Sequence, residues 1–181
     1  MVIKPILWSL VLGVGVISGI CHAASQACVP GAVLYTPSSD FVQHGDTVTH
    51  TPTGLMWRRC PIDYDWNATA KSCDLDESTD RKSYYTWSLA LAAAENLILA
   101  GYNDWRLPNI TELRTIVERR CTAFAINVDI FPTSYNNSTY WSSTTSSFQV
   151  DTARIIKFDK GTEETKSKSD SLQFMVVRDA D

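Results

Sequence analysis

Aromatic and amide side chains gather in two polar stretches towards the C-terminal end of the chain, and their chemistry suits sugar binding. Tyr135, Asn136 and Asn137 lie in one stretch, and Phe148 and Gln149 lie in the next. An aromatic face stacks on the apolar C–H face of a sugar ring, and an amide both donates and accepts hydrogen bonds. These five residues are our first candidates for a ligand-binding surface. Ordinary polar loops share this composition, so it identifies no particular ligand.

Arginine side chains offer a second chemistry, the binding of anions. Arg58 and Arg59 are adjacent, and Arg114, Arg119 and Arg120 lie along a predicted helix. The planar guanidinium group matches carboxylates and other oxyanions in a bidentate manner. We expect an anionic contact patch if folding brings these arginines together. The chain as a whole is acidic, with 16 Lys and Arg against 20 Asp and Glu, which argues against nucleic acid as a partner.

The spacing of polar residues indicates neither catalysis nor metal binding. His44 and His50 are the only histidines beyond residue 23, and we interpret both as exposed. No serine lies in the Gly-x-Ser-x-Gly pattern of a nucleophile elbow. The acidic stretch lacks the glycine and distal glutamate of an EF-hand, so we prefer a solvated loop to a calcium site. We predict no catalytic residue, no metal and no cofactor. The acidic residues of that loop are Asp63, Asp65, Asp74, Asp76 and Glu77.

The first 23 residues have the pattern of a signal peptide. Lys4 precedes an apolar run over residues 6–20, and Ala23 is a small residue at the cleavage position. That run is short for a membrane span, which needs about 20 residues. An uncleaved anchor and a lipoprotein modified at Cys21 are the alternatives. After cleavage and loss of Lys4, 15 basic residues face 20 acidic ones, a net charge of −5, and we expect no membrane span.

Four cysteines follow the predicted signal peptide, an even number that suits disulfides in an oxidising compartment. Three pairings are possible, and we favour Cys60–Cys73 with Cys28–Cys121. The first bond closes a short loop with no long apolar face, and it contributes roughly 3 kcal/mol in the loop-entropy picture. The second ties the N-terminal segment to the end of the second predicted helix. A four-thiolate zinc site is the alternative, but paired Cys-x-x-Cys spacings are missing.

Hydrophobic periodicity and turn residues predict one α+β domain over residues 44–181, preceded by an irregular N-terminal arm over residues 24–43. One helix begins after Thr86 and ends at Gly101, in a left-handed C-cap. A second helix begins at Asn109, which has Glu112 at the capping-box spacing. Residues 58–83 are expected at the surface. Strands are expected over residues 47–50, 55–57, 140–141, 153–158 and 172–177.

The stretch from Gly101 to Asn109 joins the two predicted helices and holds a tryptophan between two charged residues. We interpret Asp104 and Arg106 as structural, bonding free backbone groups or each other. Trp105 is expected in the core. Trp57 and Trp141 are expected to be buried with it.

Several motifs, taken in order, resemble the C-terminal domain family of the Legionella collagen-like protein. The resemblance implies a C-type lectin-like α+β domain with two helices packed on short antiparallel strands and stabilised by disulfides. It further implies an exported bacterial protein, since the founding member is an adhesin for sulphated glycans. This chain lacks collagen-like repeats. The motifs are Thr47–Thr49, Thr53–Cys60, Trp87, Gly101–Asn109, Glu112-Leu113, Ile126-Asn127, Phe131-Pro132, Tyr140–Thr144, Phe158 with Gly161, and Val176–Arg178.

These observations predict an exported, non-catalytic binding module, adhesin-like, that recognises a glycan or a cell-surface partner. It would be secreted, periplasmic or on the cell surface. A structural or assembly component of an envelope or pilus complex is one alternative. A relative of the formylglycine-generating oxidases is another, and it requires a free cysteine.

Overall fold

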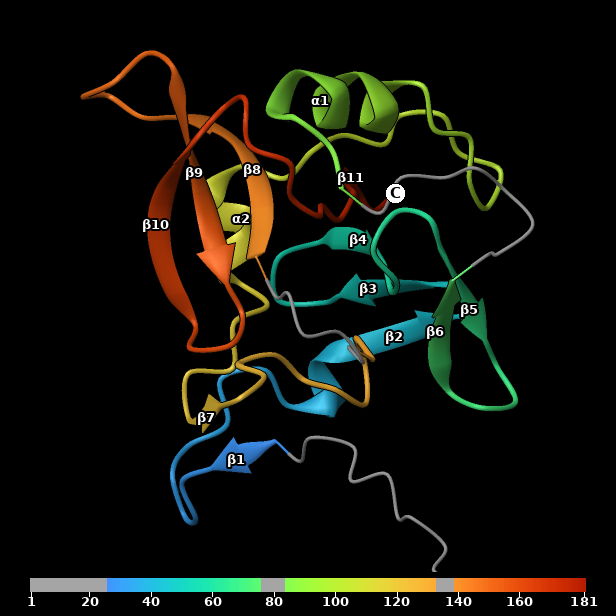
Figure 1. Ribbon diagram of the computed structural model, residues 1–181. Coiled ribbons are helices and arrows are strands. Elements are labelled where there is room, and N and C mark those ends of the chain that lie inside the picture. Colours follow the sequence, from blue (N-terminus) through green and yellow to red (C-terminus); the bar gives the residue numbers. More distant parts are fainter. Residues whose placement is uncertain (1–25, 76–83, 133–138) are drawn as a thin grey trace, which may run out of the picture.

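The computed structural model describes residues 26–75, 84–132 and 139–181 (Figure 1). The expected α+β, C-type lectin-like arrangement is wrong. Within these ranges the chain forms four small antiparallel sheets, and its two α-helices span only nine and five residues. Helices this short cannot cover a sheet as a layer, so strands and the segments between them build most of the core.

The first large sheet has four strands in the order β11-β4-β3-β2. The predicted strands over 47–50 and 55–57 are confirmed, and Gly54, with φ +66°, lies in the turn between them. Val177 pairs with Trp57, which brings the C-terminal end of the chain beside β4. The strands are β2 (Phe41–His44), β3 (Thr47–His50), β4 (Leu55–Arg58) and β11 (Val177–Asp179).

The second large sheet has the order β10-β9-β8. Two of its strands match predicted segments, whereas β10 was not expected because its residues are polar and mostly exposed. Gly161 turns the chain into β10 at φ +67°, and a Cβ there would lie 3.0 Å from side-chain atoms of Val117 and Ala125. The strands are β8 (Thr139–Thr145), β9 (Thr152–Lys157) and β10 (Thr162–Ser167).

Two further sheets are two-stranded, and a disulfide holds each of them. Cys28 pairs with Cys121 in both the strand register and the disulfide. Cys73 is bonded to Cys60, so the second bond joins a hairpin to the end of β4. The N-terminal arm, expected to be irregular, contains β1, a short 3-10 helix and part of β2. The bounds are β1 (Ala27–Cys28), β7 (Cys121–Thr122), β5 (Tyr64–Asn67), β6 (Ser72–Leu75) and η1 (Ser38–Asp40).

The helix α1 (Trp87–Glu95) ends earlier than expected. Leu99 and Tyr102 exchange backbone hydrogen bonds across a two-residue turn. Ala100 and Gly101 both have positive φ, as the mirror-image hairpin turn requires. Gly101 therefore serves a turn and not a helix C-cap.

The helix α2 (Ile110–Arg114) begins with the predicted capping box between Asn109 and Glu112. It ends after five residues because the next residues form other hydrogen bonds. Val117 forms a β-bridge with Ile126, and the backbone N–H of Glu118 donates to the carbonyl of Ala125. Arg119 and Arg120 thus lie in a turn that leads into β7.

The tryptophans expected in the core are buried. Trp57 and Trp141 are fully covered, and Trp105 is 2% exposed. The Nε1 of Trp141 donates to the carbonyl of Tyr85 at 2.8 Å, and that of Trp105 donates to the carbonyl of Leu99. In the described ranges no helix has the length and apolar character of a membrane span.

The charged residues on either side of Trp105 have partners other than those expected. Arg178 donates to Asp104 at 2.8 Å and stacks on the ring of Tyr102. Arg106 binds both carboxylate oxygens of Glu112, at 2.7 and 2.8 Å. Asp104 and Arg106 therefore fasten the segment to β11 and α2 and do not pair with each other.

Candidate functional site

A cleft with a volume of about 510 Å³ lies beside the β5–β6 hairpin, and we name it the Trp66 cleft. Its volume falls within the usual range of ligand pockets, about 300–1,000 Å³. Figure 1 shows the hairpin standing next to β2, whose residue Gln43 lines the cleft. The lining residues are Ser38, Gln43, Gly45, Arg59, Trp66, Ala68, Lys71, Val128 and Asp129.

Arg59 provides a buried positive charge in this cleft. The residue is 3% exposed, and its guanidinium donates to three backbone carbonyls, those of Gly45, Asp129 and Ile130. No carboxylate among the described residues forms an ion pair with it. Burial lowers the pKa of the Arg59 guanidinium, although a guanidinium stays protonated in proteins. The cleft therefore holds a cation whose charge is not neutralised.

Trp66 lies against this cation, with the guanidinium carbon of Arg59 3.7 Å from the ring centroid. The ring belongs to β5 and is half-buried, in a small cluster with Tyr64 and the Cys60–Cys73 disulfide. Contact with an aromatic face stabilises a guanidinium by about 0.5–2 kcal/mol. The disulfide and Arg59 together hold the hairpin as one wall of the cleft.

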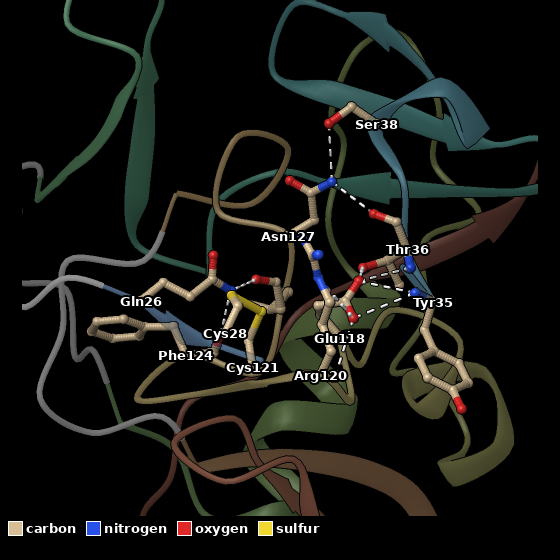
Figure 2. Close-up of polar contacts among 11 residues, drawn as sticks. Gln26, Cys28, Tyr35, Thr36, Ser38, Glu118, Arg120, Cys121, Phe124 and Asn127 are labelled. Carbon is tan, nitrogen blue, oxygen red and sulfur yellow. Dashed lines mark hydrogen bonds and ion pairs between the residues drawn. A yellow bond between two sulfur atoms is a disulfide. The ribbon is translucent and has the colours of Figure 1, made fainter. Parts of the chain in front are cut away.

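A second hollow of about 180 Å³ lies under the N-terminal arm, and we name it the Arg120 pocket. Figure 2 shows its polar contacts, with Glu118 and Asn127 facing the segment from Tyr35 to Ser38. The side chain of Asn127 donates to the carbonyl of Thr36 at 2.7 Å and to Ser38. Gln26 donates to the carbonyls of Phe124 and Ile126, so amide side chains at both ends fasten the arm to the domain.

Glu118 is the buried carboxylate of this pocket, with its side chain 3% exposed. Burial by itself raises the pKa of Glu118. Hydrogen bonds from the backbone N–H groups of Thr36, Arg120 and Tyr35, and from the Thr36 hydroxyl, outweigh burial and lower the pKa. Glu118 is therefore charged at neutral pH, and it accepts hydrogen bonds from donors on both the arm and the turn after α2.

Of the five aromatic and amide residues expected at a sugar-binding surface, Phe148 and Gln149 are described, and they line neither the Trp66 cleft nor the Arg120 pocket. Phe148 is 94% exposed on the loop between β8 and β9. Gln149 is exposed beside it, and its carbonyl accepts hydrogen bonds from Thr152. Tyr135, Asn136 and Asn137 lie outside the described residues, so their part of the expected surface stays a prediction.

The five candidate arginines make separate sets of contacts. Arg114 forms an ion pair with Glu163, which also binds Arg154. Arg119 lies over the ring of Tyr35, with 5.5 Å between its guanidinium carbon and the ring centroid. Arg58, like Arg59, is buried, and it donates to the carbonyls of Pro61 and Tyr64 and to Asp65. Only Arg59 and Arg120 line the two hollows, one in each.

Of the two histidines expected to be exposed, only His50 differs from the expectation. His50 is buried, stacked on Phe41 with ring centroids 4.7 Å apart, and its Nδ1 contacts the hydroxyl of Thr53. His44 is exposed and contacts Thr49. Within the described ranges no group of three His, Cys, Asp or Glu residues has the arrangement of a metal site.

The Lcl C-terminal domain family matches residues 46–178. The chain belongs to this family. No curated protein matches the chain. Membership of the Lcl C-terminal domain family and the two disulfides together indicate an exported bacterial domain.

The Lcl domain supplies only part of the Trp66 cleft. Arg59, Trp66, Lys71 and Asp129 lie within the matched residues, whereas Ser38, Gln43 and Gly45 precede them. The N-terminal arm and the β2–β3 turn therefore complete the cleft, whereas its two basic residues, Arg59 and Lys71, lie within the family domain.

Sequence reasoning did not identify Trp66 or Lys71 as site residues. One signal was present, because Trp66 is a large aromatic residue in a polar, disulfide-closed loop. Few apolar residues are available in such a loop to bury the ring, so the ring is expected to pack against another side chain near the surface. Its partner, Arg59, was a candidate only as part of an arginine patch.

Proposed function

We propose that this chain is an exported, non-catalytic binding module that holds a cell-surface glycan in the Trp66 cleft. The observation that carries the proposal is the buried, unneutralised charge of Arg59 against Trp66 in a cleft of about 510 Å³. Polar side chains surround that pair, and Gln43 and Lys71 supply donors at the edge. Sugar hydroxyls need such hydrogen-bonding groups beside an apolar face.

The charges of the cleft favour an acidic glycan over a neutral one. Arg59 and Lys71 contribute two positive charges, and Asp129 contributes one negative charge. A carboxylate on the ligand would neutralise the remaining charge, and the low local dielectric strengthens that attraction. This preference is confined to the cleft, because the whole chain carries a net charge of −4.

The test is binding to a glycan array by the mature domain and two variants. Trp66→Ala removes the aromatic wall, and we expect at least a tenfold loss of affinity, about 1.4 kcal/mol. Phe148→Ala is the matched control because it removes an exposed aromatic ring that is outside the cleft. Thermal unfolding of each variant separates lost binding from lost structure.

The opposite result in the two variants would place the binding site outside the Trp66 cleft. If Phe148→Ala abolished binding and Trp66→Ala left it unchanged, the ligand would lie on the loops over 134–138 and 144–149. Tyr135→Ala would then be the next variant to measure. That surface was our first expectation from composition alone.

A structural or assembly role is the second candidate, favoured by exposed apolar side chains on the N-terminal arm. Val29, Val33, Leu34 and Tyr35 are between 44% and 77% exposed. Clustered apolar surface of this kind marks contacts with other proteins. A stable protein partner recovered from the producing cell, together with no glycan affinity, would establish this role in place of the first.

The oxidase alternative depends on a reactive thiol. Cys28, Cys60, Cys73 and Cys121 are all in disulfides. Thiol counting on the denatured, unreduced protein is the measurement that decides it, and the binding module predicts no free thiol in the mature chain.

A further inference from the structure

Another cleft, with a volume of about 340 Å³, lies between the segment that follows α1 and the segment that leads into β5, and we name it the Asp63 cleft. In Figure 1 these two segments lie on the same side of the molecule as the β5–β6 hairpin. The Asp63 cleft and the Trp66 cleft have no lining residue in common. What binds in one of them is therefore a separate question from what binds in the other.

Asp63 supplies a buried carboxylate to this cleft. We expected this residue in a solvated loop, yet it is only 5% exposed. Its hydrogen-bond partner among the described residues is the hydroxyl of Tyr85, which donates to Oδ2 at 2.7 Å, and no basic side chain in those ranges forms an ion pair with it. Aspartates are seldom buried to this extent unless they are paired with a cation. The carboxylate can accept further hydrogen bonds from a group that enters the cleft.

The arginine of the same cleft does not neutralise Asp63. Arg58 donates to the carbonyls of Pro61 and Tyr64 and forms its ion pair with Asp65, at 3.2 Å. Among the described residues that line the cleft, two carboxylates therefore accompany one guanidinium. Because Arg58 and Asp65 form a pair, the remaining negative charge belongs to Asp63.

The rest of the lining is largely apolar. Ile62, Ala93 and the three residues 97–99 contribute hydrocarbon side chains, and Ile98 is 77% exposed. A lone anion would be repelled by Asp63, and a plain hydrocarbon would cover the apolar wall but leave the carboxylate unpaired. A group with an apolar stem and a positively charged end matches both parts of the cleft, as a lysine side chain does when its methylenes lie along apolar surface.

We propose that the Asp63 cleft binds a primary alkylammonium group, with the ammonium on the carboxylate of Asp63 and the methylene chain along Ile62 and Ile98. The ammonium donates charge-assisted hydrogen bonds, which are stronger than those between neutral groups. A lysine side chain of a partner protein and a free polyamine both carry this group. The inference goes beyond the proposed glycan function and does not depend on it.

The experiment titrates the mature domain with pentylammonium and with pentan-1-ol and follows the amide chemical shifts by NMR. The two probes have the same hydrocarbon chain and differ in charge, and we expect the ammonium to bind about tenfold more tightly. From ethylammonium to pentylammonium the affinity should rise by up to about fourfold for each methylene that covers the apolar wall.

Three variants assign these effects to the cleft. Asp63→Asn keeps an acceptor for the Tyr85 hydroxyl and removes the charge, and we expect about a tenfold loss for pentylammonium with no change for pentan-1-ol. Asp74→Asn is the matched control, because it removes an exposed carboxylate of β6 that does not line the cleft. Ile98→Ala truncates an exposed side chain of the wall and should weaken the dependence on chain length.

The inference is overturned if pentylammonium does not bind, if it binds no better than pentan-1-ol, or if Asp63→Asn and Asp74→Asn lose equal affinity. Thermal unfolding shows whether Asp63→Asn keeps its fold. If it does not, Ile98→Ala decides, since a dependence on chain length that stays unchanged in this variant overturns the inference and a weaker one supports it.

Two further probes distinguish the sources of the alkylammonium group. Tighter binding of Nα-acetyl-lysine N-methylamide than of cadaverine identifies a lysine on a protein surface, and the reverse order identifies a free polyamine. Trp66→Ala should leave both affinities unchanged, because Trp66 does not line the Asp63 cleft. Failure of the amines to bind therefore leaves the glycan array to decide the proposed function.

Discussion

The junction over residues 99–112 and the walls of the Trp66 cleft are held in different ways. At the junction, Trp105 is buried and its neighbours form side-chain ion pairs with Arg178 and Glu112. At the cleft, the β5–β6 hairpin shares only a small cluster with a disulfide, and buried arginines bond to backbone carbonyls. The junction depends on apolar burial, whereas the cleft depends on crosslinks and polar contacts.

This difference separates the scaffold of the domain from the cleft in which we propose that the ligand binds. At the junction Trp105 is buried, and the charged side chains of Asp104 and Arg106 are held in ion pairs with Arg178 and Glu112. The cleft is lined by the half-buried ring of Trp66 and by the buried guanidinium of Arg59, and this pair also holds the hairpin in place. Loss of a core side chain should therefore affect stability, and loss of a cleft side chain should affect binding.

The largest expected effect comes from truncating the core. Trp141→Ala removes a fully buried ring and its hydrogen bond to Tyr85, and we expect a loss of about 4 kcal/mol in the free energy of unfolding. Trp66→Ala in the cleft should cost only about 1 kcal/mol, the value of its contact with Arg59. Urea unfolding followed by circular dichroism measures both. Equal losses in the two variants would mean that the hairpin belongs to the core.

Breaking the hairpin crosslink should have the next largest effect. The Cys60–Cys73 bond spans 13 residues, and its removal in a Cys60→Ser/Cys73→Ser double variant should cost roughly 3 kcal/mol. Because this bond holds one wall of the cleft, ligand affinity should fall as well. The matched control is the Cys28→Ser/Cys121→Ser double variant, whose bond spans 93 residues and lies in the arm.

If the cleft depends on the Cys60–Cys73 bond, the double variant must lose both stability and ligand affinity. A hairpin variant that unfolds at lower urea but binds glycans as before would show that Arg58 and Arg59 suffice to place Trp66. Proton exchange of the amides in β5 and β6 distinguishes a locally released hairpin from a globally weakened domain.

The junction was largely predictable from the sequence because its signals are local or apolar. The capping box at Asn109 and Glu112 is four residues long, and the burial of Trp57, Trp105 and Trp141 follows from their size. The favoured disulfide pairing is present in the structure. The capping box and the burial of the tryptophans require no knowledge of which distant segments meet, whereas the Cys28–Cys121 bond joins residues 93 positions apart.

The cleft was not predictable because its contacts join segments far apart in sequence. Arg59 was placed at the surface, yet the carbonyls of Asp129 and Ile130 bury it, some 70 residues further on. The spacing of residues does not show which backbone carbonyls are free to accept a hydrogen bond from a distant side chain. The polar strand β10 and both helix ends were missed although their pairings are local: β10 pairs with β9, Leu99 bonds to Tyr102, and Val117 forms a bridge with Ile126.

The smallest effect we predict is a pH dependence of the free energy of unfolding, which arises where Glu118 binds the N-terminal arm. Hydrogen bonds lower the pKa of Glu118 below its ordinary value of 4.5. The folded state therefore binds the proton more weakly than the unfolded state does. The stabilisation by Glu118 is fully present above about pH 4.5 and is lost as the pH falls through the lowered pKa of the folded protein.

Comparison with Glu118→Gln isolates this residue from other carboxylates whose pKa is also lowered, such as Asp104 and Asp74. At neutral pH the variant should be less stable by about 1–2 kcal/mol, because a neutral amide is a weaker acceptor for four donors. The difference in the free energy of unfolding between wild type and variant should shrink on acidification below pH 4.5. A difference that stays constant down to pH 3 would mean that the arm does not depend on the charge of Glu118, and hydrogen exchange at Tyr35 and Thr36 would then remain unaffected by acid.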